Sequence, residues 1–271
     1  MSGNPKILTP SDNVTGVKPE LVGKIGALLE RGVRHFGSAA ASLTHQIHNP
    51  KYRHEGLNPK LAEIGLKGEQ ATSLHLRKWL EENYPNAVLC DSIHIRGALD
   101  EPELNEEPTE EEIEANGGFI DDGKDTDHVV ILGDCVYIID TKRWKKKSRY
   151  TIADDGSVLR NDRPFPGGRV HARAAKHLWA DYLHEPYTLQ SFVVINNEEV
   201  RTFRSKAWFR QPFKLVEIDR FDELLQKTID RDKPDTDVIR ADLVAQVALC
   251  CIPPYDPYKE FLKEAGVKDF I

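Results

Sequence analysis

The chain has 271 residues, of which 39% are hydrophobic and 30% are charged, and its formal net charge at pH 7 is −7. This composition supplies enough apolar surface for one substantial core and excludes a globally disordered chain. No apolar run is long enough to span a bilayer and the N-terminus has no apolar signal region, so we expect a cytoplasmic protein.

Residues 1–57 are predicted to form a flexible leader followed by a helical extension. Residues 1–17 are rich in Ser, Asn, Thr, Gly and Pro, and residues 18–48 carry apolar side chains at helical spacing. Several glycines weaken this pattern, which favours one or two short helices. Histidines gather here at spacings that match no metal-ligand pattern, so surface or core positions are the preferred interpretation: His35, His45, His48 and His54.

An amphipathic helix is predicted over residues 68–83, and a strand broken near Asp91 is expected over residues 87–95. Glu69 would lie in the first turn of the helix, where a carboxylate is favoured by the helix dipole. The alternative is that Glu69 faces a functional site as an acidic ligand. Residues 99–125 then form an acidic, apolar-poor segment, which predicts a surface insertion that is either a solvated loop or a gate.

The chain is organised around a predicted β-hairpin. Two apolar, β-branched runs, residues 129–132 and 135–139, flank Gly133-Asp134, which is a typical two-residue turn sequence. If Leu132 lies opposite Cys135, each step away from the turn pairs the next residue of one strand with the next of the other. Asp127 then lies opposite Asp140, with Cβ atoms roughly 4.5–5.5 Å apart. Lys142 lies two residues beyond Asp140 and therefore projects from the same face.

Two carboxylates opposite each other at the end of a covered hairpin repel unless a cation compensates them. A divalent metal such as Mg²⁺ or Mn²⁺ would supply that charge, since both ions prefer oxygen ligands. The alternative is that Asp127 and Asp140 lie at frayed strand ends in water, with Lys142 and Arg143 as loose ion pairs. His128 follows Asp127 and so points to the opposite face, where packing is its expected role.

The remaining elements complete an α/β pattern. A second hairpin is centred on Asp154-Asp155-Gly156, and further strands are predicted over residues 187–195 and 213–218. Helices are predicted over residues 169–183, 221–230 and 235–251, the last with Asp235 or Thr236 as its cap. We therefore expect a central mixed β-sheet flanked by helices. Its three parts are an N-terminal extension (1–57), an α/β domain (58–232) and a C-terminal helical tail (233–271).

Gly68-Glu69, Asp127-His128 and Asp140-Thr141-Lys142, in this order, resemble the nuclease-related domain family, which is similar to the wider PD-(D/E)XK nuclease superfamily. The resemblance covers roughly residues 65–227 and implies a nuclease-like α/β core. The chain departs from the family pattern at Asp140, where Glu is more usual, in the insertion 99–125, and at the junction before Arg169, where an Asn-Pro and a Gln are replaced.

The resemblance implies a Mg²⁺- or Mn²⁺-dependent nuclease that hydrolyses nucleic-acid phosphodiester bonds, and DNA is the substrate expected ahead of RNA. Asp127, Asp140 and the Thr141 carbonyl would bind one ion, Glu69 would bind a second ion or a water, and Lys142 would orient the water or stabilise developing charge. The alternatives are a non-catalytic protein that binds nucleic acid or a partner, and an interaction protein that uses its N-terminal helices. Phosphate contacts are expected from basic residues after the hairpin and near the next helix: Arg143, Lys145, Lys146, Lys147, Arg169, His171 and Arg173.

Overall fold

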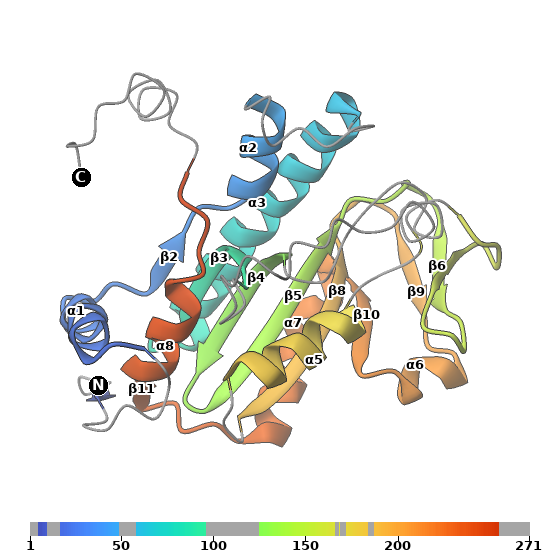
Figure 1. The fold of residues 1–271 in the computed structure, drawn as a ribbon. Helices are drawn as coiled ribbons and strands as arrows, with labels where there is room; N and C mark the ends of the chain where they lie inside the picture. Colours follow the sequence, from blue (N-terminus) through green and yellow to red (C-terminus); the bar gives the residue numbers. More distant parts are fainter. Residues whose placement is uncertain are drawn as a thin grey trace.

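The centre of the fold is a six-stranded mixed sheet with the strand order β10-β8-β5-β4-β3-β2. The computed structural model describes residues 5–9, 17–48, 58–95, 125–165, 168, 172–183 and 187–254. Figure 1 shows helices on both faces of this sheet. The six strands are β2 (His35–Gly37), β3 (Val88–His94), β4 (Asp125–Leu132), β5 (Cys135–Lys142), β8 (Thr188–Ile195) and β10 (Phe213–Glu217).

The predicted hairpin is confirmed as β4 and β5, which pair antiparallel from Leu132–Cys135 to His128–Ile139 in the expected register. Strand β5 then pairs in parallel with β8, and β8 with β10. Gly133 has a φ of +58° in the turn, and a Cβ at this position would lie 2.8 Å from the backbone oxygen of Asp235. The turn therefore requires glycine for its conformation and for the space around it.

Each face of the sheet buries a separate apolar core. On one face, α3 (Pro59–Asn83) and α7 (Ile218–Asp232) pack against side chains from β3, β4, β5 and β8. On the other face, α5 (Ala172–Leu183), α8 (Ala241–Ala248) and α1 (Pro19–Glu30) pack against the alternate side chains of the same strands. The central strands are thus covered on both sides, which explains their nearly continuous apolar runs.

A smaller three-stranded sheet lies beside β10. Its strand order is β7-β6-β9, with β6 (Arg149–Ile152), β7 (Val158–Arg160) and β9 (Arg201–Phe203). The short helix α6 (Lys206–Arg210) packs against β6 and β10, and a third apolar cluster joins these elements to β8 and β10. Strand β6 follows the last residue of β5 after a short connection, so the smaller sheet begins close in sequence to the open end of the hairpin (Figure 1).

Helix α3 begins at Pro59, so the prediction of a start near Gly68 was wrong. The Asn58 side chain accepts a hydrogen bond from the Lys60 amide at 3.0 Å, and Pro59 occupies the first helical turn. An Asn cap followed by Pro is a strong helix start, but the first turns of α3 carry few buried side chains and so lack a clear apolar stripe.

The predicted helix over residues 235–251 was also wrong in its first part. Residues Val238–Arg240 form strand β11, which pairs in parallel with β1 (Lys6–Leu8), and α8 begins only at Ala241. The pairing with a strand from the opposite end of the chain overrides the local helical pattern. Residues 221–230 do form a helix, but α7 already starts at Ile218.

The N-terminal segment takes part in the main core. Strand β2 pairs in parallel with β3 at the edge of the large sheet, α1 packs against α8, and α2 (Ala41–His48) packs against α3. Two strands thus accompany the helices expected in residues 1–57, while the division of the chain at residues 57 and 232 stays a prediction. The insertion 99–125, apart from Asp125, and the tail 255–271 lie outside the described residues.

Two further features concern the chain as far as it is described. All four cysteines are free; Cys90, Cys135 and Cys250 are buried, and Cys251 is half-buried. Within the described ranges, no helix combines the length and the apolar character that crossing a membrane requires.

Candidate active site

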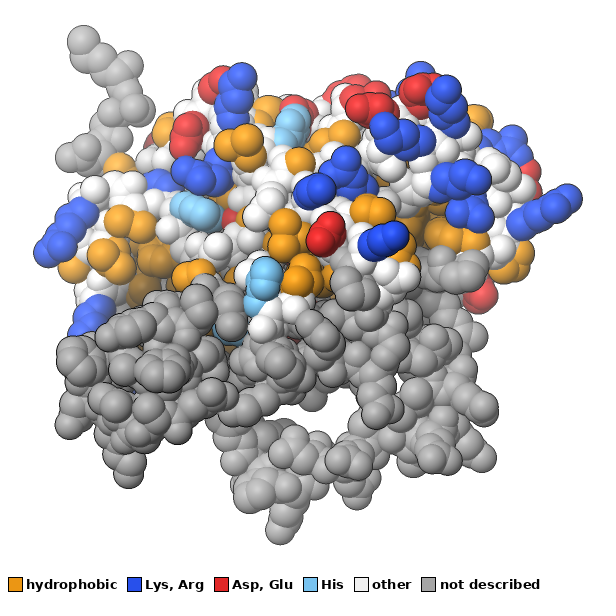
Figure 2. Space-filling model, turned by 90° about the horizontal axis from the view of Figure 1, so that it is seen from above, with side chains coloured by type: hydrophobic (Ala, Val, Ile, Leu, Met, Phe, Trp, Pro, Cys, Tyr) orange, Lys and Arg blue, Asp and Glu red, His pale blue; other side chains and the backbone are white. Residues whose placement is uncertain are grey.

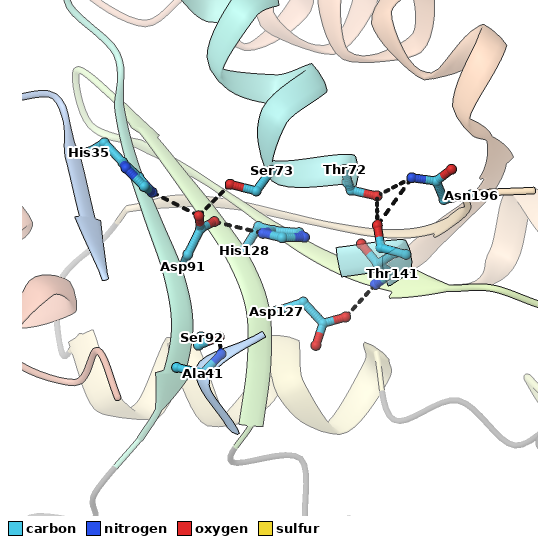
Figure 3. A network of polar contacts seen from close by, with 11 residues as sticks. His35, Ala41, Thr72, Ser73, Asp91, Ser92, Asp127, His128, Thr141 and Asn196 are labelled. Atoms are coloured by element: carbon cyan, nitrogen blue, oxygen red, sulfur yellow. Dashed lines mark hydrogen bonds and ion pairs between the residues drawn. The ribbon is translucent and has the colours of Figure 1, made fainter. Parts of the chain in front are cut away.

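The candidate site lies where β4 and β5 separate. Their ladder ends at His128–Ile139, one pair before Asp127 and Asp140. The Thr141 amide instead donates to Oδ2 of Asp127 at 2.6 Å (Figure 3), so a side chain takes the place of a backbone partner. On β5, the Lys142 ammonium donates to Oδ1 of Asp140 at 2.6 Å. The hairpin therefore brings two carboxylates and one ammonium together at its open end.

Glu69 is the third carboxylate of the site and comes from α3. Its side chain is only 8% exposed, and its carboxylate makes no hydrogen bond or ion pair with the described residues, although the charge of Lys142 favours its ionised form from a greater distance. Because α3 begins at Pro59, Glu69 lies well beyond the first turn, so the helix N-terminus does not explain it. A buried carboxylate without a partner is unfavourable in a merely structural position.

The pKa shifts show that these groups share one environment. The pKa of Asp127 is raised to about 7, first by burial and then by the charge of Asp140, while the charge of Lys142 opposes both effects. Burial also raises the pKa of Glu69 well above its usual range, followed by the charges of Asp127 and Asp140, while Lys142 again opposes the shift. Glu69, Asp127, Asp140 and Lys142 are thus brought together from three elements of the fold.

Asn196 connects the helix and the hairpin at this site. At the end of β8, its side-chain amide donates to Oγ1 of Thr72 at 2.8 Å and to the Gly68 carbonyl at 3.2 Å (Figure 3). Its backbone amide donates to the Lys142 carbonyl at 2.9 Å. Gly68 also lets Arg143 approach the helix closely, since a Cβ on Gly68 would lie 3.2 Å from Cβ of Arg143. The turn before Glu69 is therefore fixed against the end of β5.

A buried network around Asp91 supports the opposite side of β4. The Asp91 carboxylate lies 2.8 Å from Nε2 of His35, 2.7 Å from Nδ1 of His128 and 2.5 Å from Oγ of Ser73 (Figure 3). Burial acts to raise the pKa of Asp91, but the hydrogen bonds from His128 and His35 outweigh it and hold that pKa below its usual range. His128 is fully buried and turned away from Asp127, in the packing position expected.

Sequence reasoning missed Asp91, Ser73, Thr72 and Asn196. A signal for Asp91 was present, because it is the charged residue inside an otherwise apolar strand run, and a buried carboxylate needs donors. Asn196 followed the predicted strand and was interpreted as a turn residue. Its contacts to α3 and β5 depend on the tertiary arrangement, so no local pattern signalled them.

The donor atoms suit Mg²⁺ or Mn²⁺, because all three acidic side chains offer carboxylate oxygens. One oxygen of Asp127 and one of Asp140 are already hydrogen-bonded. Among the described residues, no group of three or more His, Cys, Asp or Glu side chains is placed to hold a metal ion. Mg²⁺ is commonly held by one or two carboxylates, with waters and substrate phosphates completing its shell. Asp127 and Asp140 would therefore hold such an ion only together with waters and a substrate phosphate.

The basic residues predicted to contact phosphate are only partly free to do so. Lys146 pairs with Glu198 at 2.8 Å, and Lys147 lies 3.7 Å from Glu199. Arg143 and Lys145 are exposed and follow directly on the candidate site. The other three predicted contacts cannot be placed: Arg169 and His171 lie outside the described residues, as does the side chain of Arg173.

Comparison with known proteins agrees with the resemblance found in the sequence. Residues 64–196 match the family described as the nuclease-related domain. This range contains the three carboxylates, Lys142 and, as its last residue, Asn196. No curated protein and no solved structure gives a significant match. Residues 64–196, which run from the helix of Glu69 through β3, β4 and β5 to the end of β8, are thus the part of the chain that matches the nuclease-related domain family.

Proposed function

We propose that this protein is a nuclease that uses Mg²⁺ or Mn²⁺ to hydrolyse phosphodiester bonds, with DNA as the expected substrate. One observation carries the proposal: the buried carboxylates of Glu69 and Asp127 share a site with Asp140 and Lys142 inside a nuclease-related domain. Structural ion pairs also perturb pKa values. Two carboxylates with raised pKa values beside a third acid, however, favour a site built for a cation.

Each residue has a proposed role. Asp127, Asp140 and the Thr141 carbonyl would hold one ion, and Glu69 would hold a second ion or position the attacking water. A bound divalent ion would polarise the phosphate and make water a better nucleophile. Asp140 holds the ammonium of Lys142 in place at 2.6 Å, so that its charge is available as negative charge develops on the phosphate.

The burial of the site serves this chemistry in two ways. Electrostatic interactions are stronger in a partly desolvated site than in water, so Lys142 acts on the phosphate more strongly there. The same burial makes Asp127 and Glu69 take up protons when no cation is present. Loss of those protons is then required for metal binding, and activity is expected to rise with pH through about 7, the pKa of Asp127.

The test is cleavage of supercoiled DNA, linear DNA and RNA by the parent protein and by Asp140→Ala and Lys142→Ala, each with Mg²⁺, Mn²⁺ or EDTA. We expect metal-dependent cleavage by the parent and a loss of at least about 100-fold in each variant. Asp181→Ala, at an exposed position on α5, is the matched control and should cut like the parent. Full activity in both site variants would overturn the role assignment.

A second candidate is a non-catalytic protein that binds nucleic acid on a nuclease-like fold. It is favoured by Asp140, which replaces the more usual Glu and has one oxygen engaged by Lys142. Calorimetry with Mn²⁺ separates the two proposals when it is combined with the cleavage assay. Binding that is lost in Asp127→Ala, without cleavage of any substrate, would support this second candidate.

A further inference from the structure

A second basic surface lies away from the predicted phosphate contacts. From Val200 to Val216 the sequence contains five basic residues and no acidic one, in a chain whose net charge is −7. The exposed side chains of β9 and α6 are called the basic-aromatic surface below. They are Arg201, Phe203, Lys206, Phe209 and Arg210.

The smaller sheet turns part of this surface outward. Strand β9 pairs in parallel with β6, with Arg201 beside Arg149 and Phe203 beside Thr151. Thr202 points the other way and donates to the buried Glu217, so its neighbours on β9 face solvent. The Arg149 guanidinium lies 5.3 Å from the centre of the Phe203 ring, a cation–π contact that leaves the ring 48% exposed.

Helix α6 presents the rest of the surface. Its Ala207 and Trp208 are buried against the third apolar cluster, so Lys206, Phe209 and Arg210 remain outside. Phe209 is 66% exposed, and its ring lies beside that of the buried Trp208, with 5.0 Å between the ring centres. Phe203 and Phe209 thus offer two exposed aromatic rings that a ligand could contact.

The charge of this surface is largely uncompensated. In the part of the chain that the structure describes, Lys206 and Arg210 have no ion pair, and Arg201 has only a distant one to Asp219 at 3.9 Å. The lysines nearer the candidate site differ, because Lys146 pairs with Glu198. Figure 2, which views the molecule from above, shows Lys and Arg side chains interspersed with Asp and Glu on the side where the smaller sheet lies.

We propose that the basic-aromatic surface binds single-stranded nucleic acid on its way to or from the candidate site. Arg and Lys side chains attract the phosphates, and exposed aromatic rings stack on bases. Bases in a duplex are already stacked on each other, so only unpaired bases can use Phe203 and Phe209 in this way. The connection from Lys142 to β6 links the two regions along the chain (Figure 1). The class of ligand rests on the proposed nuclease function.

The test is fluorescence anisotropy with a labelled oligothymidine, an oligouridine of equal length and a matched duplex, all in EDTA so that nothing is cleaved. Phe203→Ala combined with Phe209→Ala should weaken single-strand binding at least about tenfold and leave duplex binding nearly unchanged. Lys206→Gln combined with Arg210→Gln should reduce the salt dependence of binding, because roughly one to two fewer counterions are released from the nucleic acid. The oligouridine distinguishes RNA from DNA.

Matched controls are Leu249→Ala, which removes an exposed apolar side chain after α8, and Lys24→Gln, which removes an exposed charge on α1. Both should bind like the parent. Equal single-strand affinity in the parent and in both surface variants would overturn the proposal, as would an equal loss for duplex and single strand in the phenylalanine variant.

The two proposals fail separately. If the parent cuts no substrate but the surface variants lose single-strand binding, the nuclease function is wrong and the binding surface stands. If the parent cuts DNA and the surface variants bind and cut with unchanged affinity, the nuclease function stands and the binding surface is wrong. Circular dichroism of each variant shows that the fold is retained before binding is compared.

Discussion

Replacing Asp127 by Asn should make the metal-free protein more stable at alkaline pH. Asn has the same shape, and its side-chain oxygen can still accept the 2.6 Å hydrogen bond from the Thr141 amide. The variant lacks only the negative charge, which the site disfavours through burial and through the neighbouring charge of Asp140. The substitution therefore isolates the electrostatic strain of the candidate site from its packing.

The magnitude follows from the pKa of Asp127, which rises from 3.8 to about 7 on folding. Each pKa unit corresponds to about 1.4 kcal/mol, which gives an upper estimate of ~4 kcal/mol, reduced to about 2–4 because Asp127 is half-buried. The folded state holds the proton more tightly than the unfolded chain. The stability from this group is therefore complete below about pH 4 and is lost as the pH rises through about 7.

The assay is urea unfolding in EDTA at pH 5 and pH 8. The advantage of Asp127→Asn over the parent should grow by about 2–3 kcal/mol between these values, whereas the control Asp181→Asn should show no such growth. Added Mg²⁺ or Mn²⁺ should reverse the order at pH 8, because it binds and stabilises the parent. If the parent and Asp127→Asn lose stability in parallel between pH 5 and pH 8, the argument about a strained acidic site is wrong.

Three further substitutions test the fold and the support of the site. Gly133→Ala should reduce the free energy of unfolding by about 2–4 kcal/mol, since alanine is strained at a φ of +58° and its Cβ would contact the Asp235 backbone; urea unfolding would detect this. Asp91→Asn should cost about 3–5 kcal/mol at pH 7, and the difference from the parent should shrink on acidification as the folded parent protonates Asp91, which unfolding curves against pH would show. Asn196→Ala should lower the cleavage rate and the affinity for Mn²⁺ about 10–100-fold with a loss of stability near 1–2 kcal/mol; unchanged values would show that the bridge to Glu69 and Lys142 is only structural.

The hairpin could be predicted from sequence because its signals are local. The turn residues Gly133-Asp134 fix the register, and the apolar runs on either side indicate a covered sheet. The same register placed Asp127 and Asp140 next to each other, and the structure shows the ladder ending one pair earlier. That last step depends on the side chain of Asp127 taking the Thr141 amide, which no pattern of apolar and polar residues encodes.

Long-range contacts account for what the sequence did not predict. Strand β11 forms because β1, more than two hundred residues earlier, pairs with it, and β2 joins the large sheet through β3. Asn196 likewise acquires its position only when β8 lies beside β5. Glu69 was named as a candidate from the sequence, but its helix starts earlier than expected. Glu69 therefore lies beyond the first helical turn, and the favourable charge of the helix N-terminus does not explain why a carboxylate occurs there.

The central claim is that the open end of the hairpin holds a divalent cation. The most direct measurement is anomalous diffraction from crystals soaked in Mn²⁺. We expect a peak in contact with carboxylate oxygens of Asp127 and Asp140, on the side of Glu69, and no such peak in crystals of Asp140→Ala. Density only at surface acids, or an identical peak in the variant, would contradict the account.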